Sequence, residues 1–199
     1  MFRDAVRKFA GEKIAPNVKI WEKAGKYPDE YYRYLAEMGF MGLLVPEEYG
    51  GAGGSMIDLA ILCEEMGRAG VSIPLTHVSA CCRAIVHQGN EDQRNRYLPD
   101  MASGKKIGAY CQTEPNAGSD LASLKTRAVD NGDHFVINGQ KIWTSQAHWS
   151  DWIFCLVRTS SEGKKQQGIS FLLIDMKTPG IEVRPIISIA LGHHLNEVF

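Results

Sequence analysis

Apolar residues in the first half of the chain recur every three to four positions, which is the period of an amphipathic helix. This spacing predicts a helix over residues 2–14, marked by Phe2, Val6, Phe9 and Ala10. A second helix is expected to begin at Pro28, because proline suits a first helical position and two acidic residues follow it. Gly39 is expected to end that helix.

Capping residues mark three further helices. Ser55 and Asp58 have the spacing of a capping box, so a third helix is expected to begin there. It is apolar around most of its circumference and is therefore expected to be buried, on the basis of Ile57, Leu59, Ile61, Leu62 and Met66. A fourth helix from about Ile73 to Gln88 is rich in small residues, and a fifth is expected between the cap Asn90 and Gly104.

After Gly104 the pattern changes to short apolar runs separated by polar turns. The expected strands are Lys125–Asp130, His134–Asn138, Gln140–Thr144, Trp152–Thr159, Gly168–Asp175 and Ile181–Ile187. Asn131-Gly132 and Asn138-Gly139 are typical of tight hairpin turns. Because helices come first and strands follow, the sequence predicts a segregated α+β protein. We expect a helical bundle over residues 1–104 and an antiparallel β-barrel or sandwich over 105–199.

Composition narrows the class of protein without identifying it. The 199 residues are 44% apolar and 23% charged, with a net charge of −1 and interspersed signs, which gives no indication of a nucleic-acid or membrane surface. No apolar run is long enough to span a bilayer, and the first residues lack the apolar core of a signal peptide. Five cysteines without a CxxC pair predict free, buried thiols in a reducing compartment rather than a zinc site.

The run Tyr-Cys-Gln-Thr-Glu-Pro-Asn-Ala-Gly-Ser-Asp over residues 110–120 combines a strand end, a turn and small polar side chains. Backbone N–H groups of such a loop can form an anion-binding nest. Gly118 permits close backbone approach, and the hydroxyls of Thr113 and Ser119 can donate to a carbonyl or phosphate oxygen. An ordinary connection between a helical and a strand domain explains the loop chemistry equally well.

A second unusual run, Asn-Gly-Gln-Lys-Ile-Trp-Thr-Ser, occupies residues 138–145. Trp143 at a strand end offers a flat apolar wall, and the hydroxyls beside it can reach a ring nitrogen. Taken alone, Trp143 is better interpreted as a core residue of a barrel. The presence of both runs at this separation favours a binding site.

Together these two runs resemble the flavin-binding signature of the acyl-CoA dehydrogenases, and the resemblance covers essentially all of the chain. It implies an FAD site at the joint between the helical and β domains. From the first run, Tyr110, Gln112 and Thr113 would touch the isoalloxazine ring. Gly118 and Ser119 would lie by the pyrophosphate, with Ser119 also near the pantetheine of the CoA substrate.

The second run supplies the other side of the implied flavin site. Trp143 would shield one face of the ring, with Thr144 beside it. Ser145 falls where the family has a hydroxyl that donates to flavin N5. Many members carry threonine at that position, so Ser145 keeps the hydroxyl and loses a methyl group.

The resemblance implies an oxidoreductase of fatty-acid β-oxidation that dehydrogenates an acyl-CoA thioester. A carboxylate removes the α-proton while the β-hydride passes to flavin N5, and hydrogen bonds polarise the thioester oxygen. The family's base is a glutamate of a C-terminal helical domain, which these 199 residues do not include. Glu114 is expected to accept hydrogen bonds from nearby backbone instead, so no catalytic residue is assigned in this chain.

The resemblance also implies partners and a setting. An electron-transferring flavoprotein is the expected electron acceptor, and the full-length protein is expected to be a homo-oligomer. The compartment is expected to be the bacterial cytoplasm or the mitochondrial matrix. Because Asn196 to Phe199 has the pattern of a strand's first half, the chain is expected to be a fragment that is inactive alone.

Two alternatives to the dehydrogenase stay open. Acyl-CoA oxidases and some flavin monooxygenases share the scaffold, and a non-catalytic remnant or partner subunit could bind flavin or acyl-CoA without turnover. The glycine run 50–54 is better interpreted as a connection between helices than as a nucleotide-binding loop. His193 and His194 suit a polar strand better than a metal site, and His77 and His87 suit surface or core positions.

Overall fold

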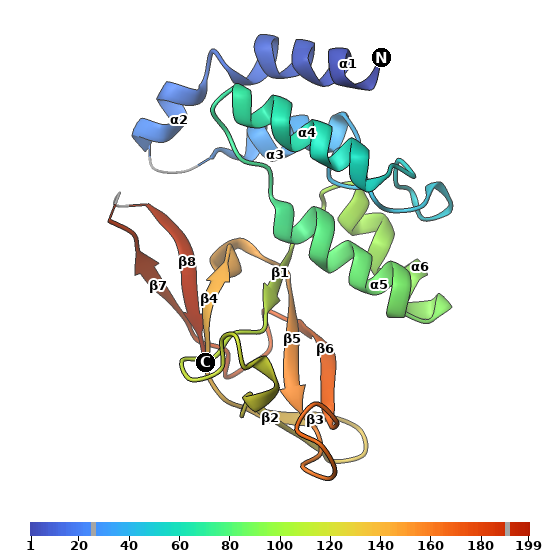
Figure 1. Cartoon of the computed structure of the whole chain (residues 1–199), viewed down its shortest axis with the longest axis vertical. Helices are drawn as coiled ribbons and strands as arrows, with labels where there is room; N and C mark the ends of the chain where they lie inside the picture. The colour runs from blue at the N-terminus through green and yellow to red at the C-terminus, as the bar shows by residue number, and fades with distance from the viewer. Residues whose placement is uncertain (25–26, 190–191) are drawn as a thin grey trace. The chain divides into compact units, whose positions relative to one another are not determined.

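The computed structural model describes residues 1–24, 27–189 and 192–199. The chain divides into two compact units, Met1–Lys106 and Ile107–Phe199 (Figure 1). The first contains the helices and the second contains the strands, which confirms the segregated α+β class. Within the described residues, no helix has the length and apolar character needed to cross a membrane.

Within the described residues, the helical unit contains six α-helices joined by short π and 3-10 segments. In order these are α1 (Phe2–Phe9), η1 (Ala10–Ile14), α2 (Val18–Ala24), α3 (Asp29–Glu37), η2 (Glu47–Tyr49), α4 (Met56–Arg68), η3 (Thr76–Cys81), α5 (Cys82–Gln88) and α6 (Glu91–Ala102). The predicted capping box of Ser55 with Asp58 is present, and the predicted cap Asn90 also forms a capping box, with Gln93. Helix α2 was not expected from the sequence, because it is short and only Val18 and Trp21 on it are buried.

Helix α4 is buried on one face rather than around its circumference. Leu59, Leu62 and Met66 lie in the core, whereas the side chain of Ile57 is 72% exposed. The expectation that Ile57 is buried is therefore wrong. A helix that packs on one side buries residues three and four positions apart, and Ile57 lies outside that stripe.

A buried carboxylate joins α1 to α4. Glu65, 2% exposed, accepts hydrogen bonds from Arg7 Nε at 2.9 Å, from Arg7 Nη2 at 2.9 Å and from Arg3 Nη1 at 2.8 Å. The hydrogen bonds from Arg7, and then those from Arg3, outweigh the effect of burial and lower the pKa of Glu65 to about 2. Periodicity could not indicate this pairing, because the partners lie about sixty positions apart in sequence.

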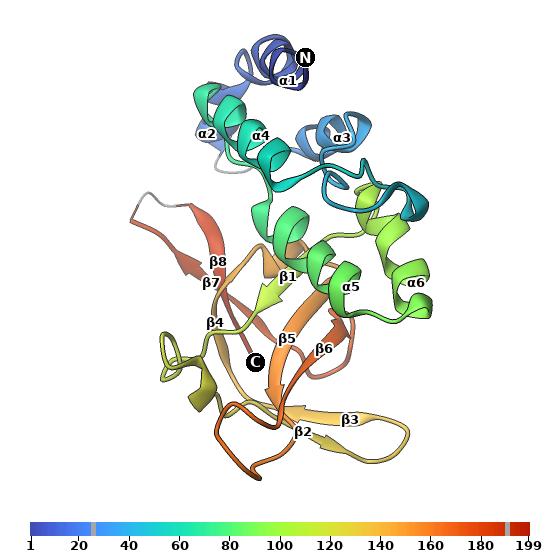
Figure 2. The same cartoon turned by 45° about the vertical axis from the view of Figure 1, so that its right-hand side comes forward.

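The described part of the β unit forms two sheets. The strands are β1 (Gly108–Cys111), β2 (Arg127–Asp130), β3 (Phe135–Asn138), β4 (Lys141–Ser145), β5 (Trp152–Arg158), β6 (Ile169–Asp175), β7 (Val183–Ile187) and β8 (His193–Val198). Short 3-10 segments η4 (Leu121–Ser123) and η5 (Ala147–Trp149) lie between them. One sheet has the order β1-β5-β2-β3 with β6 also paired to β5, and the other has the order β4-β8-β7. Figure 2 shows β1, β5 and β6 side by side.

The expected antiparallel pairing is correct for most strands but wrong for two pairs. Strand β1 runs parallel to β5, with Cys111 opposite Cys155, and β2 meets β5 in parallel at Arg127 and Arg158. Parallel partners need a long crossover connection, and the residues between β1 and β5 supply one. The crossover also carries most of the first run of unusual sequence, residues 112–120, and all of the second, residues 138–145.

One of the two expected hairpin turns forms a hairpin, and the other does not. Asn131-Gly132 does connect an antiparallel pair, β2 and β3, and Gly132 has the positive φ of 94° that such a turn requires. Asn138-Gly139 does not form a hairpin, because β3 and β4 belong to different sheets. Gly139 is instead needed for close packing: a Cβ there would lie 2.4 Å from the hydroxyl oxygen of Thr126.

Candidate functional site

The two runs of unusual sequence lie against each other at the root of the loop that follows β1. Lys141 Nζ donates a hydrogen bond to the backbone oxygen of Gln112 at 3.0 Å. The backbone N–H of Ile142 donates to the oxygen of Thr113 at 2.9 Å. The two runs, which are distant in sequence, therefore contact each other directly. The sequence indicated this contact only through the presence of both runs.

Glu114 holds the loop closed. Its backbone exchanges two hydrogen bonds with that of Ala117, at 3.2 and 3.1 Å, so that the residues between them form a tight exposed tip. Its carboxylate accepts from the backbone N–H groups of Lys125 at 2.6 Å and Thr126 at 2.8 Å. The expectation that Glu114 is bonded to nearby backbone is therefore confirmed.

The charge of Glu114 is balanced inside the unit. Lys141 Nζ lies 3.0 Å from Glu114 Oε1, and both side chains are buried. Burial acts to raise the pKa of Glu114, but hydrogen bonds from Thr126, Lys125 and Lys141 outweigh it and lower the pKa below its usual range. A carboxylate that is paired and ionised in this way is a poor general base, because base catalysis favours a pKa near the working pH.

The far side of the loop is open. Gly118 and Ser119 are exposed, and a Cβ built on Gly118 would meet no atom within 4 Å. Side chains from later segments of the chain hold the end of the loop in place. Lys165 Nζ lies 2.6 Å from Asp120 Oδ1, and Arg158 Nη2 donates to the backbone oxygen of Ala122 at 2.7 Å. The chain's own packing thus leaves free space beside Gly118 on a loop whose ends are anchored.

A β-bulge in β4 turns Trp143 outward. The register of β4 against β8 shifts between Lys141 and Thr144, and Trp143 between them has a positive φ of 61°. This left-handed conformation costs about 1–2 kcal/mol for a residue with a Cβ atom. The indole side chain is 54% exposed. Bulges and strained residues of this kind are common beside binding sites, where they re-aim a side chain.

Thr144 and Ser145, which follow Trp143, differ in how far their side chains are exposed. Thr144 is 1% exposed and its hydroxyl donates to Cys111 Sγ at 3.6 Å, so a ligand on the outer side of β4 would meet the backbone of Thr144 but not its hydroxyl. Ser145 is half-buried and pairs with Leu195 of β8. Among the residues that the structure describes, none hydrogen-bonds the hydroxyl of Thr113, Ser119 or Ser145.

Strand β1 places its side chains on two faces. Cys111 faces the core of the β unit. Tyr110 and the residues Gln112 and Thr113 that follow the strand are half-buried. The ring of Tyr110 lies 5.7 Å from that of Phe171, centroid to centroid. The side chains of Tyr110 and Cys111 therefore lie on opposite faces of the sheet, as those of successive residues in a strand do.

Asn196 fixes the segment after Trp143, and the sequence analysis did not find this role. Its side-chain amide donates to the oxygen of Thr144 at 3.0 Å and to Nδ1 of His148 at 3.1 Å. Its oxygen accepts from His193 Nε2 at 2.8 Å, and the rings of His148 and His193 stack with centroids 3.9 Å apart. Burial and the neighbouring His193 lower the pKa of His148 to about 4. His193 thus takes part in a polar strand network, as expected.

Comparison with known proteins identifies the class. Residues 1–105 match the family model of the acyl-CoA dehydrogenase N-terminal domain, and residues 109–195 match that of the acyl-CoA dehydrogenase middle domain. These are the helical and the β parts of one oxidoreductase fold. The chain belongs to the acyl-CoA dehydrogenase family.

Curated relatives agree with this family. The chain is 36% identical over 189 residues to the probable acyl-CoA dehydrogenase YngJ of Bacillus subtilis, covering 92% of this chain and 49% of the relative. It is 39% identical over 182 residues to the mitochondrial isobutyryl-CoA dehydrogenase of Dictyostelium discoideum, covering 90% and 44% respectively. The chain therefore spans about half the length of the curated relatives it matches.

Solved structures share the fold of the whole chain. The acyl-CoA dehydrogenase of Geobacillus kaustophilus superposes with a TM-score of 0.91 at 32% identity, covering 100% of this chain and 54% of that one. A glutaryl-CoA dehydrogenase of Mycobacterium smegmatis, in complex with FADH2, superposes with a TM-score of 0.87 at 26% identity. The match covers 99% of this chain and 50% of the glutaryl-CoA dehydrogenase chain.

Proposed function

We propose that this chain is the flavin-binding part of an FAD-dependent dehydrogenase that acts on an acyl-CoA thioester. The observation that carries the proposal is the joining of the loop after β1 to the bulged strand β4 through Lys141 and Ile142. Membership of the acyl-CoA dehydrogenase family supports it, as does the FADH2 complex of the similar glutaryl-CoA dehydrogenase.

The residues on the outer side of this structure fit a flavin. The exposed indole of Trp143 is a flat apolar surface of the kind that covers one face of an isoalloxazine ring. The hydroxyls of Thr113 and Ser145 can bond the polar edge of the ring. Tyr110 and Gln112 belong to the same proposed ring contact. For Thr144 we propose a backbone contact only, because its hydroxyl is turned inward.

The exposed residues that follow the loop tip, Gly118 and Ser119, fit the charged part of the cofactor. Backbone N–H groups around Gly118 and Ser119 can meet a pyrophosphate, since no side chain fills the space beside Gly118. We also assign Ser119 to the pantetheine of the substrate. The salt bridge of Asp120 with Lys165 keeps the Asp120 carboxylate occupied, which limits its repulsion of an anion nearby.

In the proposed reaction, FAD held at this site would supply the acceptor for the hydride of the substrate β-carbon. The contribution of this chain would be to bind and orient the flavin. Trp143 would cover one face of the ring, and the hydroxyls of Thr113 and Ser145 would hydrogen-bond its polar edge. Glu114 is not the base that removes the α-proton, because it is buried, ionised and paired with Lys141. We assign that role to the glutamate that the family carries in its C-terminal helical domain.

Partners and setting follow from the same proposal. An acyl-CoA is the substrate, an electron-transferring flavoprotein is the electron acceptor, and the complete protein is a homo-oligomer. The working compartment is the bacterial cytoplasm or the mitochondrial matrix. The similarity to a Bacillus subtilis protein and to a mitochondrial one supports both settings.

The direct test is anaerobic reduction of the complete, flavin-loaded protein by a series of acyl-CoA thioesters. Bleaching of the flavin absorbance near 450 nm with formation of the enoyl-CoA product is expected for at least one of them, on the order of one equivalent per flavin. Tight flavin and acyl-CoA binding without bleaching would instead favour the non-catalytic partner subunit. Rapid reoxidation by oxygen would favour an acyl-CoA oxidase.

A further inference from the structure

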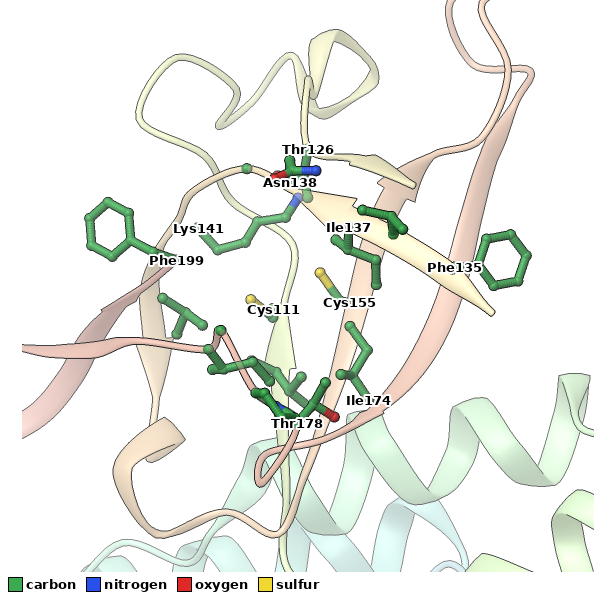
Figure 3. A pocket seen from close by; sticks show the side chains of 17 residues that line it. Cys111, Thr126, Phe135, Ile137, Asn138, Lys141, Cys155, Ile174, Thr178 and Phe199 are labelled. Atoms are coloured by element: carbon green, nitrogen blue, oxygen red, sulfur yellow. The ribbon is translucent and has the colours of Figure 1, made fainter. Parts of the chain in front are cut away.

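The β unit contains a cavity of about 380 Å³ that the proposed flavin site does not use (Figure 3). Its walls are mainly apolar and include Ile137, Ile153, Ile174, Pro179, Ile181 and Val198, while Thr126, Asn138, Lys141 and Thr178 add polar groups. The lining also includes Phe135 and Val136 of β3, which are 44% and 40% exposed, so the cavity reaches the surface at that strand. A small apolar molecule therefore has both a route inward and an apolar environment.

Two thiols lie together in this cavity. Cys111 of β1 and Cys155 of β5 are direct partners across the parallel strands, and both line the cavity. Figure 3 shows the two sulfur atoms near each other among the lining side chains. Adjacent strands lie about 4.8 Å apart, which is within the Cα separation at which a disulfide can close.

The surroundings make the two thiols chemically different. Interaction with Cys155, together with burial, holds the pKa of Cys111 well above its ordinary value. The hydroxyl of Thr144 donates to Cys111 Sγ at 3.6 Å and acts against this shift, since it lowers the pKa of Cys111, but the interaction with Cys155 and burial outweigh it. Interaction with Cys111 lowers the pKa of Cys155, and the ammonium of Lys141 acts in the same direction, while burial and the Glu114 carboxylate oppose it. The thiol of Cys155 also lies 3.8 Å from the backbone oxygen of Leu156. Cys155 is thus the better nucleophile and Cys111 the protonated neighbour.

We infer that Cys111 and Cys155 form an oxidation site that takes a small apolar organic hydroperoxide from the cavity and closes to a disulfide. The Cys155 sulfur attacks the terminal peroxide oxygen, the O–O bond breaks, and the departing alkoxide takes the proton that the Cys155 thiol gives up and leaves as the alcohol. Cys155 is then a sulfenic acid.

The second step consumes the neighbouring thiol. The Cys111 sulfur attacks the sulfur of the sulfenic acid, an S–S bond forms, and the hydroxyl group leaves with the Cys111 proton as water. In total, two thiols lose two electrons and two protons while one hydroperoxide becomes one alcohol and one water. No metal or flavin takes part, so the site does not depend on the proposed function.

The test is peptide mapping after treatment of the purified protein with cumene hydroperoxide under non-reducing conditions. Tryptic cleavage after Lys106, Lys125, Lys141 and Arg158 separates the two thiols into fragments 107–125 and 142–158. We expect one disulfide that links these fragments. For each oxidant, the rate of oxidation at the site is divided by its rate with free N-acetylcysteine. This ratio is expected to be at least about tenfold larger for cumene hydroperoxide than for hydrogen peroxide, because the apolar cavity concentrates cumene hydroperoxide.

Single variants separate the two roles. In Cys111→Ser, dimedone is expected to trap a sulfenic acid on Cys155, since no resolving thiol remains. In Cys155→Ser, oxidation of Cys111 is expected to be at least about tenfold slower, because burial still raises the pKa of Cys111 after its partner is removed. Cys63→Ser, on a half-buried thiol of α4, is the matched control and is expected to leave the disulfide unchanged.

Three results would overturn the inference. One is oxidation of Cys63 or of the buried Cys81 before any disulfide forms between fragments 107–125 and 142–158. Another is the absence of a trapped sulfenic acid in a folded Cys111→Ser protein, with folding checked by circular dichroism. The third is equal relative rates for cumene hydroperoxide and hydrogen peroxide, which would exclude the cavity as the entry for an apolar oxidant.

Discussion

Lys141 and Glu114 form a buried ion pair, with Nζ 3.0 Å from Oε1, and this contact joins the loop after β1 to strand β4. The same ammonium also bonds the backbone of Gln112. One lysine therefore holds together the two segments to which we assign the flavin. It also lies beside the paired thiols, whose ionisation it affects.

Replacing Lys141 by methionine is expected to destabilise the β unit by about 3 kcal/mol, because it leaves the buried charge of Glu114 without its partner. The measurement is the urea midpoint, followed by the near-UV circular dichroism of the tryptophans. The double variant Lys141→Met with Glu114→Gln is expected to recover part of this loss, since neither charge remains. A double variant as unstable as the sum of both single ones would show that the pair is not coupled.

Trp143 is expected to lower the stability of the protein and to strengthen its binding of flavin. Trp143→Gly relieves the left-handed backbone and should raise stability by about 1 kcal/mol, while Trp143→Ala keeps the strain. Both variants are expected to weaken flavin retention in the complete protein, because the flat apolar wall is lost. His194→Ala, on an exposed residue of β8, is the control. Equal flavin loss in the Trp143→Ala and His194→Ala proteins would remove Trp143 from the site.

His148 is expected to make the stability of the β unit depend on pH. Its pKa is about 4 in the folded protein and near 6.5 when unfolded, so the unfolded state binds more protons between these values. Stability is therefore present above pH 6.5 and is lost as the pH falls from about 6.5 to about 4. Thermal midpoints over this range, compared with those of His148→Asn, measure the contribution. A slope unchanged by the substitution would contradict it.

Glu65 is expected to control the acid stability of the helical unit. Its folded pKa is about 2, below the ordinary value of 4.5, so its contribution is present above pH 4.5 and is lost as the pH falls toward 2. Glu65→Gln is expected to lower the unfolding midpoint at neutral pH and to flatten this acid dependence. Its exposed neighbour Glu64, which pairs with Arg3, is the control: Glu64→Gln should change the midpoint little.

The sequence by itself determined the helices with clear caps and the separation of helices from strands. Ser55 and Asn90 mark helix starts by local hydrogen bonding, and Asn131-Gly132 marks a turn by local backbone geometry, so neighbouring residues carry the information. The two unusual runs were also visible, because their residue types occur together at short range. The family followed from them and was confirmed by comparison.

Only the tertiary structure decided which distant residues meet. Asn138-Gly139 has the composition of a hairpin turn, yet close packing against Thr126 and the pairing of β4 with β8 give it another role. The parallel alignment that sets Cys111 beside Cys155 depends on a crossover between strands, which no local pattern encodes. Side-chain direction at Thr144 likewise depends on the bulge at Trp143. Local propensity acts over a few residues, whereas register, burial and ion pairing are decided by segments far apart in sequence.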